Sequence, residues 1–254
     1  LLFDNMAALH NPDWCMRHVD GSVIRYELRR AGEDIDRWYM LCTNSAYYQY
    51  VLDQLDEIGR NYRADGLFID IPTSPNGQLC YCRHCKEAYS AEYGADLPSI
   101  PKWDEEWKKQ VEWRMNVSER FWQEIRSTIH SHLPDIPVAS NYFPLFGRPW
   151  SYGRGTFSLE DFVLGEDGGS KSGQASTAST FIRGLGSKHH MTSVAVDVFN
   201  PVSDHLLDLE VSTILAHRGL VMLFTLGGYV DGSLDKEYFD RMERAYRNVG
   251  AKKE

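Results

Sequence analysis

The sequence has 254 residues, of which 43% are hydrophobic and 25% are charged. This composition is typical of a globular protein, and a chain of this length can form one large α/β domain. The formal net charge of −9 argues against nucleic acid or an anionic membrane as the main partner, because both bind basic surfaces. No apolar run is long enough to span a membrane.

The N-terminus and the cysteines bear on the cellular location. Residues 1–4 lack the basic start of a signal peptide, and the absence of an initiator Met predicts a fragment or a processed chain. Five cysteines, three of them crowded together, fit reduced thiols. These features predict a cytoplasmic protein.

The first recognisable elements lead up to a short buried strand. Residues 22–28 are expected to form a strand, and a polar segment follows as far as residue 38. From Ser45, a favourable N-cap residue, apolar side chains recur with helical spacing as far as Tyr62. The apolar run Leu67–Ile69, bounded by turn residues, then predicts a buried strand.

The same step from helix to strand recurs along the rest of the chain. Predicted helices cover residues 104–132, 175–185, 206–217 and 236–249. Predicted strands cover residues 138–142, 162–165, 192–196 and 221–226. Strands that alternate with helices at this spacing predict right-handed β/α units and a parallel sheet.

Two α/β architectures fit this alternation. A closed barrel needs eight strands, so a barrel would lack its first two or three β/α units in this chain. A doubly wound open sheet is the alternative and needs no missing units. It usually carries a glycine-rich phosphate turn, and the sequence has none, because the glycines at 165–169 flank two acids that would repel phosphate.

Three cysteines lie close together after the first predicted β/α step. Cys80, Cys82 and Cys85 fall within six positions, which suits one tetrahedral metal ion better than disulfides. The interpretation is a structural Zn²⁺, because an all-thiolate site is closed and leaves no position for a catalytic water. The alternative is three reduced, buried thiols.

A structural zinc needs a fourth ligand, for which there are three candidates. They are Cys42, Cys15 and His84. Cys42 is favoured because it lies just before the helix that leads to the strand at Leu67–Ile69. His84 is expected to point away, because it lies between two of the other ligands.

Three predicted strands end in acidic residues. These are Asp70, Glu166 with Asp167, and Asp197. In a parallel barrel all strand ends face one mouth, so acids that are distant in sequence converge there. Hydrolysis of a glycosidic bond needs two such carboxyl groups, one protonated and one ionised. The alternative is that these acids cap loops or are simply solvated.

Polar and aromatic side chains also follow the predicted strands. Asn141 can hydrogen-bond a sugar hydroxyl, and Tyr142, Trp150 and Phe199 can stack on a sugar ring. The alternative is that most of these aromatic rings belong to the core.

The cysteine pattern resembles a known family. Cys42 in Cys-Thr-Asn-Ser-x-x-Tyr, followed by Cys80-Tyr81-Cys82-x-x-Cys85, resembles the zinc cluster of family 42 glycoside hydrolases, the thermophilic-type β-galactosidases. The run from Asp65 to Asp70, with Gly94-x-x-Leu97-Pro98, is closer to the family called hypothetical glycosyl hydrolase family 6. The resemblance extends from about residue 13 to residue 232.

This resemblance implies a fold and a metal. The expected fold is a (β/α)8 TIM barrel entered near its third strand, so that residues 1–254 form a single, partial glycosidase domain without its C-terminal accessory domain. The expected cofactor is a structural Zn²⁺ held by the cysteines at 42, 80, 82 and 85.

The resemblance also bears on the catalytic residues. The β-galactosidases carry an Asn-Glu pair where this chain has Ile69-Asp70, which disfavours β-galactosidase specificity. That position is more similar to fucosidase- and amylase-type barrels, in which an Asp is the nucleophile. The resemblance therefore implies Asp70 as nucleophile and Glu166 as general acid/base, with Asp197 in reserve for either role.

These inferences lead to one favoured function and two alternatives. The favoured one is a glycoside hydrolase with a carbohydrate substrate, a retaining mechanism, and homo-oligomerisation through regions outside this chain. The first alternative is a barrel that binds carbohydrate without cleaving it. The second is a zinc-stabilised interaction module, for which Tyr81 and Arg83 should be exposed and an acidic cleft absent.

Overall fold

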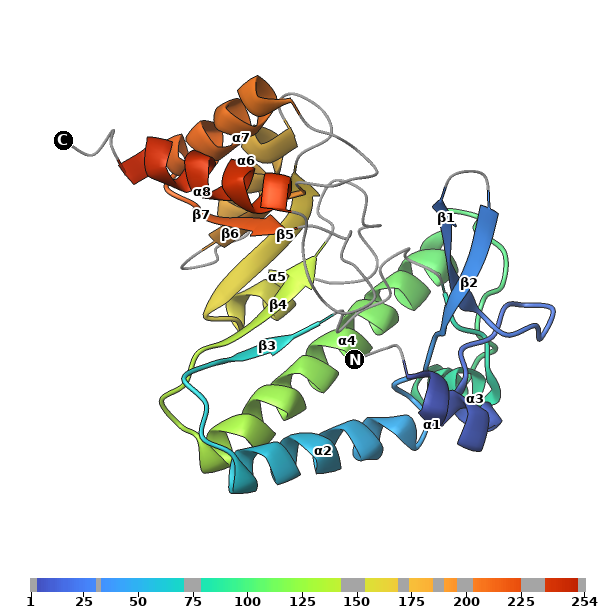
Figure 1. Cartoon of the computed structure of the whole chain (residues 1–254). Coiled ribbons are helices and arrows are strands. Elements are labelled where there is room, and N and C mark those ends of the chain that lie inside the picture. The colour runs from blue at the N-terminus through green and yellow to red at the C-terminus, as the bar shows by residue number, and fades with distance from the viewer. Residues whose placement is uncertain are drawn as a thin grey trace. The chain divides into compact units, whose positions relative to one another are not determined.

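The computed structural model describes residues 4–30, 33–70, 79–142, 154–168, 174–184, 190–195, 203–224 and 236–250. The chain is an α/β protein with a parallel sheet, as predicted (Figure 1). It divides into an N-terminal unit, residues 1–138 with 148–159, and a C-terminal unit, residues 139–147 with 160–254. None of the described helices is long and apolar enough to cross a membrane.

The N-terminal unit begins with small elements that the sequence patterns only partly predict. The elements are α1 (Asn5–His10), the 3-10 helix η1 (Pro12–Trp14), β1 (Arg25–Arg30) and β2 (Glu33–Tyr39). Strands β1 and β2 form an antiparallel hairpin whose register sets Arg29 opposite Asp34 and Arg30 opposite Glu33. The expected strand at 22–28 therefore starts later, and the expected polar segment is its partner strand. Opposite charges across a register favour strand pairing without apolar alternation.

Three longer helices build the rest of this unit. They are α2 (Tyr47–Asn61), α3 (Arg83–Tyr93) and α4 (Glu105–His132), with β3 (Leu67–Ile69) between the first two and the short α5 (Arg154–Ser158) after them. The predicted helices at 45–62 and 104–132 are confirmed, and so is the predicted strand, although only Ile69 in it is buried and Phe68 is 47% exposed. Helix α3 was not predicted.

Local capping explains where these helices begin and end. The N-cap of α2 is Ala46 and not Ser45 as expected, although the Ser45 hydroxyl accepts a hydrogen bond from the Tyr47 amide at 3.2 Å. At the start of α4 the N-cap Asp104 carboxylate accepts a hydrogen bond from the Trp107 amide at 2.9 Å. Helix α3 ends at Gly94, whose φ of 64° is the left-handed conformation that favours glycine.

The core of the N-terminal unit lies between α2 and α4, which run side by side (Figure 1). Four α4 side chains are at most 1% exposed there: Phe121, Trp122, Ile125 and Ile129. They pack on the apolar face of α2, which includes Val51 and Leu55. Burial of each large side chain contributes about 1.5–3 kcal/mol, so this contact stabilises the unit by several kcal/mol.

The C-terminal unit is a parallel sheet covered by helices. Its elements are β4 (Val138–Tyr142), β5 (Phe162–Gly168), α6 (Gln174–Gly184), β6 (His190–Ala195), α7 (Asp204–Ala216), β7 (Leu220–Phe224) and α8 (Lys236–Gly250). The strands pair in the order β4, β5, β6, β7. Small and aliphatic residues, among them Ala175, Val211 and Ala245, join the three helices in one core with Val221 and Leu223.

The boundaries predicted for this unit need two corrections. Strand β6 begins at His190, two residues earlier than expected. Strand β5 continues to Gly168, so Glu166 and Asp167 lie within the strand and not beyond its end. The described parallel sheet has five strands, in the order β3, β4, β5, β6, β7, and a barrel has eight. The barrel and the single domain over residues 1–254 stay predictions.

Close approach of α2 and α4 predicts the effect of adding one methyl group. A Cβ at Gly59 would lie 3.0 Å from the His132 ring. Although alanine favours a helix, Gly59→Ala should therefore lower the free energy of unfolding by about 1–3 kcal/mol through overpacking. Urea denaturation measures this change, with Gln54→Ala on the exposed face of α2 as the control. A stabilised Gly59→Ala variant would show that the helices can separate freely.

The same contact predicts a dependence on pH. The Asp56 carboxylate accepts a hydrogen bond from His132 Nε2 at 2.7 Å and pairs with Arg60 at 2.9 Å, and the His132 bond lowers the pKa of Asp56. A lowered pKa contributes stability above the unfolded value of 3.8 and loses it as the pH falls through the folded value. The stability difference between wild type and Asp56→Asn should be constant near neutrality and shrink below about pH 4. Denaturation at several pH values tests this, and a difference that grows in acid would contradict it.

Candidate metal centre and catalytic face

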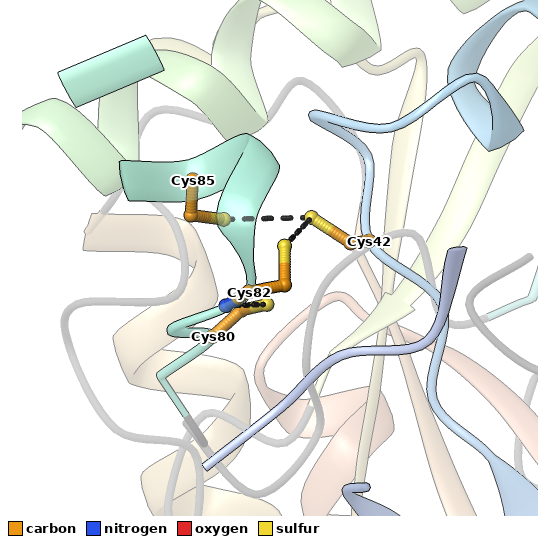
Figure 2. A group of neighbouring side chains, drawn as sticks. All are labelled: Cys42, Cys80, Cys82 and Cys85. Carbon is orange, nitrogen blue, oxygen red and sulfur yellow. Dashed lines mark hydrogen bonds between the residues drawn. The ribbon is translucent and has the colours of Figure 1, made fainter. Parts of the chain in front are cut away.

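Four cysteines come together in the N-terminal unit (Figure 2). Their sulfur atoms all lie within 4.8 Å of one another. The Cys42 sulfur is 3.4 Å from that of Cys85 and 3.6 Å from that of Cys82. Cys42 lies just before α2, Cys80 and Cys82 lie just before α3, and Cys85 is in the first turn of α3. All four are buried.

The arrangement of the sulfurs matches a tetrahedral zinc site. With Zn–S bonds of about 2.3 Å, the sulfurs of a tetrahedral site are about 3.8 Å apart. The sulfur distances of 3.4 and 3.6 Å and the outer limit of 4.8 Å bracket this value. Four soft ligands of one type also suit Zn²⁺ and leave no open coordination position. The donor set therefore fits a structural zinc.

The structure separates the candidates for the fourth ligand. Cys42 belongs to the cluster, as predicted, whereas Cys15 packs in the other hydrophobic cluster of this unit. The His84 side chain points away, as expected, because its Nε2 lies 2.8 Å from the Asp13 carboxylate. Arg83 binds the same carboxylate at 2.6 Å and is the first cause of the lowered pKa of Asp13.

The crowded sulfurs share protons unequally. Hydrogen bonds with the other sulfurs, that of Cys80 first, and burial raise the pKa of the Cys42 thiol well above its usual range. Hydrogen bonds with the other sulfurs, that of Cys42 first, lower the pKa of Cys82. Four neighbouring sulfurs cannot all be thiolates unless a cation offsets their charge. A divalent metal would displace the protons that remain.

Polar groups around the cluster support negatively charged sulfur. The Asn44 amide lies 3.4 Å from the Cys42 sulfur, and its side-chain Nδ2 lies 3.3 Å from the Cys85 sulfur. Cys82 is the N-cap residue of α3 and therefore lies at the positive end of the helix dipole, which favours a thiolate there. Asn44 was not predicted to contact the sulfurs, although its place two residues after Cys42 made it a candidate for such a contact.

The cysteine segment is packed against α4 and not displayed to solvent. Tyr81 is 7% exposed, and Trp113 of α4 makes an edge-to-face contact with Tyr89 of α3, with ring centroids 5.3 Å apart. Arg83 is exposed. A docking module was expected to expose both Tyr81 and Arg83. Because Tyr81 is buried, only Arg83 meets this expectation.

Asp70 lies between the two segments of the chain that carry the clustered cysteines. It follows β3 directly, and its residue is exposed. Cys42 precedes α2, which leads into β3, and Cys80 lies ten residues after Asp70. A metal bound to the cysteines would therefore hold the chain on both sides of the strand that carries Asp70.

The C-terminal edge of the parallel sheet carries the other candidates. Asn141, predicted to bind sugar, is 4% exposed in β4, and Tyr142 ends that strand opposite Gly165. The register between β5 and β6 changes from Gly165↔Thr192 to Gly168↔Val194. Strand β5 therefore uses three steps where β6 uses two, and the extra residue lies at Glu166–Asp167. Such bulges are frequent next to active sites, where they redirect a side chain.

Several predicted site residues lie outside the described part of the chain. They are Trp150, Asp197 and Phe199, together with the side chains of Tyr142, Glu166 and Asp167. Asp70 and Glu166 also belong to different units. The distance between their carboxyl groups stays a prediction.

Comparison with known proteins gives one family and one type of fold. Residues 3–71 match the model of the family hypothetical glycosyl hydrolase 6. The search of curated proteins finds no match.

Solved structures of glycosidases resemble the fold. The α-L-fucosidase isoenzyme 2 from Paenibacillus thiaminolyticus is 21% identical, with a TM-score of 0.72 over 99% of this chain and 36% of the fucosidase. The β-galactosidase from Bacillus circulans sp. alkalophilus is 16% identical, with a TM-score of 0.67 over 93% of this chain and 43% of the galactosidase. The PgaB glycoside hydrolase domain from Bordetella bronchiseptica is 12% identical, with a TM-score of 0.60 over 89% of this chain and 68% of that domain.

The coverage shows how much of each solved glycosidase this chain matches. The chain spans less than half the length of the fucosidase and of the galactosidase. At these identities the likeness concerns the fold. The family match includes Cys42 and Asp70 and ends at residue 71. The resemblance to hypothetical glycosyl hydrolase 6, and to glycoside hydrolases of the β-galactosidase and fucosidase types, is therefore confirmed.

Proposed function

We propose that this protein is a glycoside hydrolase whose active site lies at the C-terminal strand ends of a (β/α)8 TIM barrel. The observation that carries the proposal is the placement of acids: Asp70 directly follows β3, and Glu166 lies at the irregularity in β5. The family match through residue 71 and the fold shared with glycosidases support the same function.

The proposed mechanism assigns one role to each acid. Asp70, ionised, attacks the anomeric carbon and forms a glycosyl ester, while Glu166, protonated, donates its proton to the leaving oxygen. Glu166 then removes a proton from water, which cleaves the ester and restores Asp70. This retaining mechanism needs the two carboxyl groups about 5–5.5 Å apart. Asp197 is the reserve for either role.

The substrate would be held by side chains at the same strand ends. Asn141 would hydrogen-bond a sugar hydroxyl, and its burial in β4 would keep its amide in one orientation. Tyr142, Trp150 and Phe199 would stack on the sugar rings.

The cysteines at 42, 80, 82 and 85 would hold a structural Zn²⁺. The ion would cross-link the segment before α2 to the segment before α3. It would take no part in cleaving the glycosidic bond. Its contribution to catalysis would be to fix the segments on both sides of Asp70. The buried Tyr81 favours this structural role over that of a docking module.

The metal proposal predicts a defined zinc content. Purified protein should contain one zinc per chain, and Cys85→Ser should contain none and unfold at a lower temperature, because metal binding contributes to folding. Cys15→Ser is the matched control, since Cys15 is also a buried thiol but lies outside the cluster. Atomic emission spectroscopy and thermal unfolding measure the two effects. Equal zinc in both variants would rule out the cluster as the site.

The catalytic proposal predicts different effects for neighbouring acids. Asp70→Asn and Glu166→Gln should each lower kcat on aryl glycosides by about 10²–10⁴-fold, with little change in the melting temperature. Asp167→Asn is the control, because it removes the adjacent carboxylate of the same strand irregularity. Full activity of Asp70→Asn would remove Asp70 from the mechanism. Loss of activity in Asp167→Asn alone would transfer the acid/base role to that residue.

A further inference from the structure

Arg114 of α4 is attached to the cysteine segment at two points. Its guanidinium NH2 donates a hydrogen bond to the Cys80 carbonyl at 2.9 Å. The guanidinium carbon lies 5.2 Å from the centre of the Tyr81 ring and 5.6 Å from that of Trp113. Arg114 is therefore held between α4 and the residues that precede α3.

This guanidinium has no carboxylate partner among the residues that the structure describes. Its Nε is buried without a hydrogen-bond partner. By contrast, Arg83, Arg120 and Arg244 each have an acidic partner. A half-buried cation without a counter-charge is costly, so its position requires an explanation.

The cysteine cluster offers that counter-charge. Four thiolates around a divalent ion carry a net charge of about −2, and the sulfurs are buried. Such a charge is costly unless cations or hydrogen-bond donors lie nearby. Asn44 supplies donors to two of the sulfurs, but it carries no charge.

We infer that Arg114 is a positioning residue for the metal centre: it fixes Cys80 as a ligand through the carbonyl bond and offsets the negative charge of the metal–thiolate cluster. The inference rests on the proposed zinc. Groups that orient metal ligands typically contribute a factor of about 10–100 to metal affinity.

The chemistry of the site favours arginine over lysine. The guanidinium is planar, so it can stack on the Tyr81 ring while one of its N–H groups binds the Cys80 carbonyl. A lysine would keep the charge but lose the stacking and the fixed direction of the hydrogen bond. The two contributions of Arg114 can therefore be separated by substitution.

The test measures the zinc dissociation constant by competition with a chromophoric chelator. Arg114→Met should weaken zinc binding about 10–100-fold, and Arg114→Lys should lie between Arg114→Met and wild type. Arg120→Met is the matched control, because Arg120 is also on α4 but pairs with Glu92 at 3.8 Å. It should bind zinc as wild type does.

A second measurement separates metal positioning from ordinary packing. If Arg114 acts on the metal, Arg114→Met must destabilise the zinc-loaded protein more than the metal-free protein, because metal affinity and stability are linked. A merely structural residue would destabilise both forms equally. If Arg114→Met does not fold, Arg114→Lys provides the same comparison.

The outcomes distinguish this inference from the proposals on which it rests. Wild-type affinity in both Arg114 variants, or an equal loss of stability with and without zinc, would overturn the role of Arg114 and leave the zinc site intact. Absence of zinc from the wild-type protein would overturn both, while the aryl glycoside assay would still decide the hydrolase proposal.

Discussion

The constraint on which the N-terminal unit depends is the meeting of four buried sulfur atoms. Their residues come from segments about 40 positions apart, yet all lie within 4.8 Å of one another. Uncharged thiols gain little from such crowding, and four thiolates would repel one another strongly. A divalent cation turns this arrangement into an attractive one, and it would thereby fix the starts of both α2 and α3.

The sequence predicted the elements whose stability comes from apolar periodicity. Helices α2 and α4 were found at their expected places because their buried residues recur at regular intervals, and strand β3 because its short apolar run is bounded by turn residues. Helix α3 was missed because its two buried residues, Cys85 and Tyr89, give too weak a period. Strand β2 was missed because its residues read as polar, and its pairing depends on the register with β1.

The candidate site was predictable to a similar degree. Short spacing identified Cys80, Cys82 and Cys85, and Cys42 was chosen from three candidates because it lies just before the helix that leads to β3; all four belong to the cluster. The irregularity at Glu166–Asp167 was not predictable, since it arises from the pairing of β5 with β6 about 25 residues further along the chain. Arg114 was missed for the same reason: its contact with Cys80 joins residues 34 positions apart.

The position of Asp70 explains why a structural metal would matter to a hydrolase. Strand β3 has only three residues, of which Ile69 is buried in the core of α2 and α4 while Phe68 is 47% exposed. Catalytic carboxyl groups must be held to within about 0.5 Å. Two neighbouring segments add to the contacts of the strand: α2, packed on α4, holds the chain before it, and a metal bound at Cys80 would hold the chain ten residues after Asp70. The metal would act on catalysis through the backbone, at a distance from the bond that is cleaved.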